Sequence, residues 1–235
     1  MRVAFLGLGR RESSMFAALF RAGHQLVTWE GPWAGACPEV GGVVVRLASL
    51  ADVLAGADAV ISLGPDDQAV HDLVMRRGLL DFMAADTVHV SMSRASVPAA
   101  QHLTEMHEAK QQRFVSAPLI RQAPGSVSIV AAGLTEAVRQ VEPLLEAIGQ
   151  CIVVGATPWH ANLVSLGIDT LADGGPDRAE EVHATIRAAG ISLELFRQVA
   201  RTPLPVDDTT PPAGMVPVPP DRLLLRSDAD FADHT

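Results

Sequence analysis

Residues 1–30 constrain the fold of this chain more than any other stretch. The apolar run at residues 2–6 is typical of a buried strand, Gly7-Leu8-Gly9 predicts a tight turn, residues 13–22 predict a helix, and residues 25–29 predict a second strand. The apolar residues of the helix recur at spacings that place them on one face, against the strands. This is the opening half of a βαβ nucleotide-binding unit, in which the first glycine permits the turn and the second lets the backbone approach a pyrophosphate.

The third glycine of that pattern is replaced by Glu12. A carboxylate at the start of a helix stabilises the helix dipole, but it would also occupy or repel the place of a pyrophosphate. Arg10 is positioned to restore phosphate binding, or else to pair with Glu12 or face solvent. The turn therefore indicates a dinucleotide site through Gly7, Gly9 and Arg10, and weakens that indication through Glu12.

Two further residues complete the expected cofactor site. Glu30 ends the second strand, where an acidic residue commonly accepts hydrogen bonds from the adenosine ribose and disfavours the 2′-phosphate of NADP. A solvated loop glutamate is the alternative reading of Glu30. Pro65 follows another predicted strand at the same edge.

Composition excludes several classes of function. The net charge is −9 and no basic run exists, which argues against a nucleic-acid surface. No apolar run reaches the roughly 18 residues of a membrane span. Met1 leads directly into the first strand, and Cys37 and Cys151 are expected to be plain thiols, so we expect a cytoplasmic protein. The chain has no tyrosine, and its only lysine is Lys110, which limits the possible proton donors.

Strands and helices alternate along the rest of the first 156 residues. Strands are expected at residues 41–46, 58–63, 87–92, 113–116, 126–131 and 150–154, and helices at 50–55, 67–75, 98–111 and 135–148. This order predicts an α/β fold of the Rossmann type, a doubly wound and mainly parallel sheet over residues 1–156. A ligand crevice is expected beyond the carboxyl ends of the strands, near Gly7, Pro65 and Ser93.

Residues 158–172 predict a helix that is apolar almost all round, as in a helix buried between domains. Its polar residues Asn162, Ser165, Asp169 and Asp173 form one stripe. We expect burial to raise the pKa of Asp169, which would make it a proton donor; a solvated face of the helix is the alternative. Asn162 and Ser165 are further catalytic candidates.

His160, at the start of the same helix, is either a substrate-binding group or a surface residue, and His89 either a general base or a paired core histidine. No histidine spacing suits a metal site, so none is expected. Short helices follow to residue 202, and residues 203–235 are a proline-rich acidic tail whose Leu223–Leu225 are apolar enough to dock on the body or on a partner subunit.

Several segments together resemble one enzyme family. They are residues 3–9, 21–24, 56–61, 65–67, 117–118, 142–149 and 187–191. In their order and spacing they resemble the β-hydroxyacid dehydrogenase superfamily, which includes 3-hydroxyisobutyrate and 6-phosphogluconate dehydrogenases and the related imine reductases. The resemblance implies a Rossmann domain, an interdomain helix and a small helical domain at residues 157–202 that forms a homodimer.

The resemblance also shows where this chain departs from the family. The lysine that serves the dehydrogenases as acid corresponds to Asn162 or Ser165, and the imine reductases place Asp or Tyr at the corresponding site. The substrate motif after the fifth strand appears as Ser91, Ser93 and Arg94. The Ser-Gly-Gly substrate loop appears as Ile120-Arg121-Gln122, where Arg121 could hold an anion.

Three functions follow, in order of preference. The first is acid/base chemistry on a small molecule, such as cyclisation, dehydration or isomerisation, with Asp169 as acid or base and no obligatory cofactor. The second is an imine or carbonyl reductase that uses NAD(H) or NADP(H), with Asp169 as proton donor. The third is a non-catalytic subunit.

Overall fold

The computed structural model describes residues 1–7, 13–31, 45–121, 127–174 and 178–201. Several expectations lie outside these ranges: Gly9, Arg10, Glu12, Cys37, Gln122 and the tail at residues 203–235. Within the described ranges, no helix combines the length and the apolar character needed to cross a bilayer.

A single sheet runs through the described part of the N-terminal region, in the order β3-β2-β1-β4-β5-β6-β8-β7, with β9 on the other side of β8. Parallel pairing joins the first six strands of this order and joins β9 to β8, whereas β8 runs antiparallel to β6 and β7. The mainly parallel, doubly wound sheet expected from the sequence is confirmed. The strands are β1 (Arg2–Leu6), β2 (Gln25–Trp29), β3 (Val45–Leu47), β4 (Ala59–Ser62), β5 (Val88–Ser91), β6 (Arg113–Ser116), β7 (Leu119–Arg121), β8 (Val127–Gly133) and β9 (Gln150–Gly155).

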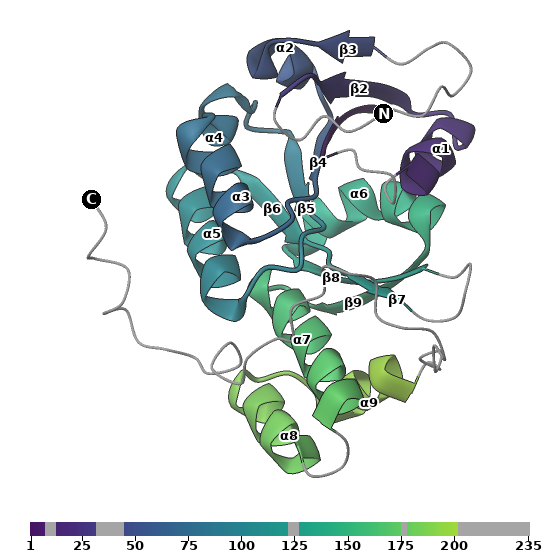
Figure 1. Ribbon diagram of the computed structural model, residues 1–235, viewed down its shortest axis with the longest axis vertical. Coiled ribbons are helices and arrows are strands. Elements are labelled where there is room, and N and C mark those ends of the chain that lie inside the picture. Colours follow the sequence, from purple (N-terminus) through teal and green to yellow (C-terminus); the bar gives the residue numbers. More distant parts are fainter. Residues whose placement is uncertain (8–12, 32–44, 122–126, 175–177, 202–235) are drawn as a thin grey trace.

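Helices cover both faces of the sheet (Figure 1). Alternate residues of β1 point to opposite faces, so Val3 and Phe5 pack under α1 and α6, while Ala4 and Leu6 pack under the helices of the other face. The helices of the first face are α1 (Ser13–Arg21) and α6 (Thr135–Ile148); those of the second are α2 (Leu50–Leu54), α3 (Asp67–His71), η1 (Asp72–Arg76), α4 (Leu79–Phe82) and α5 (Val97–Ala109).

The last three helices form a third core beyond the sheet, at the bottom of Figure 1. They are α7 (Trp159–Gly174), α8 (Ala179–Ala188) and α9 (Leu193–Arg201). Leu163, Val164 and Ile168 of α7 are buried among residues of β8 and of α8 and α9. The helix expected to be apolar almost all round is therefore buried by the sheet on one side and by two helices on the other.

Local differences from the sequence expectations have clear causes. Asp66 caps α3 by accepting a hydrogen bond from the Ala69 N–H at 2.8 Å, and the helix then widens into the π-helical turn η1, which ends at Arg76. The short elements α4 and β7 were not expected, because four-residue and three-residue segments carry too little periodicity to be recognised.

Candidate functional site

Gly7 begins the turn at the carboxyl end of β1. It has φ +106°, and a Cβ added there would lie 2.2 Å from the carbonyl oxygen of Leu63, which follows β4. The Leu63 N–H donates to the Leu6 carbonyl at 2.9 Å, so the two strand ends are held together. No other residue type fits this position without moving the backbone. Gly7 thus marks the place where β1 lies between β2 and β4, the point of the sheet where ligands bind in doubly wound folds.

Glu30 and Pro65 lie exposed at the same edge, after β2 and β4. The Glu30 N–H donates to the Leu47 carbonyl at 3.0 Å, which fixes its backbone and leaves its carboxylate in solvent. A glycine after the first strand and an acidic residue after the second are the arrangement typical of a dinucleotide site, and the cofactor-binding roles of Gly7 and Glu30 stay predictions. Gly9 and Arg10 lie in residues 8–12, outside the described ranges.

Ser93 connects this edge to the end of β5. Its side chain is buried, and its Oγ accepts a hydrogen bond from the Gly64 N–H at 2.7 Å. Ser91, the last residue of β5, is also buried. The segment after β5 is therefore tied to the segment after β4, next to the Gly7 turn.

Asn162 joins α7 to the sheet. Its Nδ2 donates to the carbonyls of Ala95 at 3.1 Å and Ser93 at 3.4 Å, and its Oδ1 accepts from the Ser116 hydroxyl. The side chain is only 2% exposed, so these bonds use its amide group within the core. The catalytic role expected for Asn162 stays a prediction. In the structure, Asn162 holds the segment after β5 against α7.

Asp169 lies two turns further along α7 and forms an ion pair with Arg94. Its side chain is 28% exposed, so the burial expected from the sequence is incomplete. The proton-donor role expected for Asp169 stays a prediction. Ser165 lies buried between Asn162 and Asp169 on the helix, and Asp173 is exposed, so the polar stripe runs from the core to the solvent.

The remaining predicted substrate residues are less well connected. His160 is half-buried at the start of α7, its ring stands edge-on against Trp159, and burial lowers its pKa. Arg121 ends β7, but its side chain lies outside the described part of the structure, as does Gln122. The structure thus brings together Ser93, Arg94, Asn162 and Asp169.

Ser116 is a site residue that the sequence analysis did not select. It is the polar last residue of a buried strand at the carboxyl edge of the sheet, the same signal that selected Ser91. In the described part of the chain, no three His, Cys, Asp or Glu side chains converge as metal ligands would.

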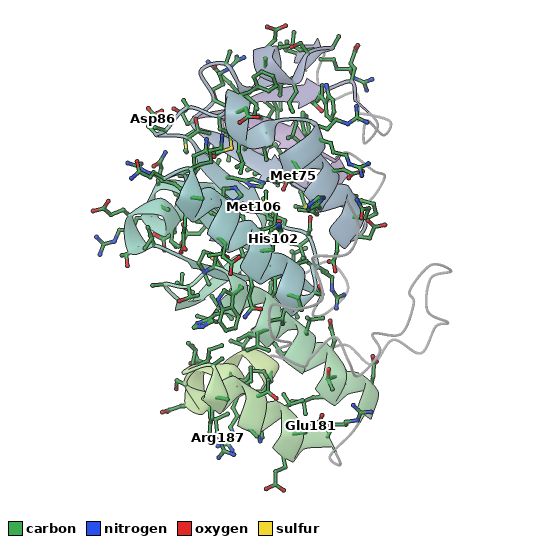
Figure 2. The ribbon with its side chains drawn as sticks, turned by 90° about the vertical axis from the view of Figure 1, so that its left-hand side faces the viewer. Met75, Asp86, His102, Met106, Glu181 and Arg187 are labelled. Atoms are coloured by element: carbon green, nitrogen blue, oxygen red, sulfur yellow. The ribbon has the colours of Figure 1, made fainter. Side chains whose placement is uncertain are left out.

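A second buried polar chain starts at Ser62, the last residue of β4, and continues under α5. Ser62 Oγ lies 2.8 Å from His89 Nε2, His89 Nδ1 lies 2.8 Å from His107 Nε2, and His107 Nδ1 lies 2.6 Å from the Leu103 carbonyl oxygen. Because a carbonyl only accepts, each ring donates through Nδ1 and accepts through Nε2, and the Ser62 hydroxyl donates at the start. Figure 2 shows the side of the molecule on which α5 lies; His102 and Met106 mark α5, and Glu181 and Arg187 mark α8.

Burial keeps both histidines of this chain of hydrogen bonds neutral, although the hydrogen bond to the Leu103 carbonyl acts to raise the pKa of His107. Burial lowers the pKa of His107 to about 4, and burial, followed by the repulsion of His107, lowers that of His89 well below its usual value. Of the two readings of His89, pairing in the core is the one that the structure supports, and a general base is not needed there.

Comparisons with known proteins agree with this geometry. Residues 2–155 match the family described as the NAD binding domain of 6-phosphogluconate dehydrogenase. An uncharacterized oxidoreductase of Bacillus subtilis, YfjR, is 28% identical over 218 residues, which cover 85% of this chain and 72% of the relative. An NAD-dependent L-serine dehydrogenase of Pseudomonas aeruginosa is 31% identical over 163 residues, which cover 64% of this chain and 52% of the relative. The chain therefore spans only about half of that second protein.

Solved structures share the fold at lower sequence identity. An imine reductase variant from Myxococcus stipitatus in complex with NAD⁺ has a TM-score of 0.65 at 17% identity, covering 84% of this chain and 69% of that one. A Mycobacterium tuberculosis 3-hydroxyisobutyrate dehydrogenase with L-serine has a TM-score of 0.57 at 22% identity, covering 85% and 70%. These similarities support the Rossmann fold with a following helical region.

Proposed function

Because this chain belongs to the family of the NAD binding domain of 6-phosphogluconate dehydrogenase, we propose that it is an NAD(P)-dependent oxidoreductase acting on a small molecule between the sheet edge and α7. The observation that carries this proposal is the Gly7 turn, where β1 and β4 meet without room for a side chain. A dinucleotide bound there would supply the hydride acceptor or donor. Gly7 would lie against its pyrophosphate, and Glu30 would bind its ribose.

At the other end of the proposed crevice, beside α7, hydrogen bonds within the chain fix the position of the segment after β5. The Gly64–Ser93 hydrogen bond and the three hydrogen bonds of Asn162 hold the segment after β5 against α7. Arg94 and Asp169 carry the charges of this region, and each is partly open to solvent. A small polar substrate would therefore meet one guanidinium and one carboxylate.

A direct titration tests the cofactor half of this proposal. The chain has three tryptophans and no tyrosine, so energy transfer from tryptophan to bound NADH or NADPH gives a simple binding signal. We expect saturable binding that is stronger for NADH than for NADPH, because Glu30 disfavours a 2′-phosphate. The absence of binding by the folded protein at millimolar concentrations of both cofactors would contradict the proposal.

One observation favours a second candidate, acid/base chemistry without a nicotinamide cofactor. Lys110, the only lysine of the chain, is bonded to Asp81 at 2.9 Å on the exposed side of α5, and Asn162 already uses its amide within the core. No ammonium group is therefore available to serve as the acid of a dehydrogenase. Substrate turnover that needs Asp169 and proceeds without added dinucleotide would support this candidate over the first.

We also propose that the protein forms a homodimer. The resemblance implies a homodimer formed through α7, α8 and α9. Analytical ultracentrifugation of the full chain tests this point, and a monomer at all concentrations would contradict it.

A further inference from the structure

Asn162 holds the peptide backbone on both sides of one residue. Its Nδ2 donates to the carbonyl of Ser93 and to that of Ala95, and Arg94 stands between them. The Asn162 side chain is 2% exposed, so both hydrogen bonds form away from water. Two such bonds, to carbonyls on either side of Arg94, restrict the direction in which the Arg94 side chain leaves the backbone.

The guanidinium end of the Arg94 side chain contacts α7, the helix that carries Asn162. Arg94 pairs with Asp169, which lies seven residues after Asn162 and therefore on the same face of α7, about 10 Å further along its axis. One face of α7 thus holds the carbonyls of the two residues that flank Arg94, through Asn162, and pairs with the Arg94 guanidinium, through Asp169. Arg94 also makes a further interaction within the chain.

The ion pair is suited to exchange its anion. The Arg94 side chain is 38% exposed and the Asp169 side chain 28% exposed. Ion pairs with this much access to water contribute little to stability, and a guanidinium binds a planar carboxylate through two parallel hydrogen bonds. Ser93, Asn162 and Ser165 are uncharged, whereas two further carboxylates lie close to this region: Asp173, exposed one turn after Asp169 on α7, and Asp67, which accepts hydrogen bonds from Ser96.

From these contacts we propose that Asn162 is a positioning residue that presents Arg94 as the anion-binding group of the cleft, and that Asp169 is a resident counter-ion which a substrate carboxylate replaces. The inference rests on the proposed function in one respect, that this cleft receives a small molecule. It deepens that function by naming Arg94 as the residue of this chain that binds an anionic substrate and Asp169 as the counter-ion which that substrate displaces. It also gives Asp169 a role other than proton transfer.

The test uses malonate as a carboxylate probe and malonamide as its uncharged counterpart, each titrated calorimetrically into the full-length protein. We expect malonate to bind and malonamide not to bind. Arg94→Gln should abolish malonate binding. Asp169→Asn should strengthen it, by roughly threefold to tenfold, because the competing carboxylate is gone.

The positioning role of Asn162 requires a separate pair of variants. Asn162→Leu keeps the size of the side chain but removes both donors, and should weaken malonate binding roughly tenfold, the loss expected when a guanidinium contact is displaced. Thr104→Val removes a buried hydrogen bond within α5, that from Thr104 Oγ to the Ala100 carbonyl, and is the matched control for general destabilisation. It should leave malonate affinity unchanged.

The possible results separate the inference from the proposed function. Equal malonate affinity in the wild-type protein and in Asn162→Leu, weaker binding in Asp169→Asn, or no binding by the wild-type protein would each overturn the inference. If Asn162→Leu does not fold, the Arg94→Gln and Asp169→Asn results still decide the anion-binding role. NADH titration of the same samples reports independently on the proposed function, since malonate binding without NADH binding would refute only the latter.

Discussion

Replacing His107 by leucine should change how the stability of the protein depends on pH. At neutral pH the variant leaves the Nδ1–H of His89 without its acceptor, and we expect a loss of about 2 kcal/mol in the free energy of unfolding. Leucine removes a group that titrates, so the variant and the wild-type protein should respond differently to acid.

The lowered pKa of His107 determines whether stability rises or falls with pH. His107 has a pKa of about 4 in the folded protein, below the 6.5 of an exposed histidine, so the unfolded chain binds more protons between these two values. Its contribution to stability is complete above pH 6.5 and falls as the pH drops towards 4, by about 1.4 kcal/mol per pH unit, or about 3 kcal/mol over the whole window. His89, whose pKa is also lowered by burial, acts in the same direction.

Urea unfolding at a series of pH values measures both effects. Above pH 6.5 the wild-type protein should be more stable than His107→Leu. As the pH falls, the wild-type protein loses stability through the protonation of His107, which the variant cannot undergo. The two free energies of unfolding should therefore become equal at about pH 5, where this loss has reached the initial difference of about 2 kcal/mol. Phe114→Leu is the control, because Phe114 stacks on His107 with ring centroids 4.2 Å apart but does not titrate. It should destabilise by a similar amount at every pH, whereas parallel curves for His107→Leu and the wild type would refute the reasoning.

Three further predictions concern the sheet edge. Gly7→Ala should destabilise the protein by at least about 3 kcal/mol and remove NADH binding, because its Cβ would meet a carbonyl oxygen at 2.2 Å; thermal melting and NADH titration measure this. Ser93→Ala should cost about 1–2 kcal/mol in urea unfolding, because the Gly64 N–H loses its acceptor. Glu30→Ala should reduce the preference for NADH over NADPH roughly tenfold in competitive titration. An unchanged preference would show that Glu30 does not contact the cofactor.

The sheet could be predicted from the sequence because its signals are local. Mostly apolar runs at residues 2–6 and 58–63, separated by segments of helical periodicity, specify parallel strands without knowledge of the rest of the chain. The position of Gly7 followed from the same pattern. Short elements such as β7 were missed because three residues contain too few alternations.

The roles within the site could be predicted only in part. The sequence indicates the polar stripe on α7, but not how deeply each of its residues is buried or what it contacts. The partners of Asn162 and Asp169 come from segments 46–75 residues earlier in the chain. Asp169 was expected to be a buried proton donor, and the expectation could not include Arg94 because a loop arginine has no periodicity that predicts its contact. The pairing of His89 with His107 depends likewise on how α5 lies across β5.

A crystal structure of the protein grown with a saturating concentration of NADH tests the central claim most directly, that the edge at Gly7 is a dinucleotide site facing the polar residues of α7. We predict that the pyrophosphate lies against the Gly7 turn, the ribose beside Glu30, and the nicotinamide towards Ser93 and Arg94. A saturated crystal in which this edge carries no dinucleotide, or in which NADH binds elsewhere, would contradict the claim.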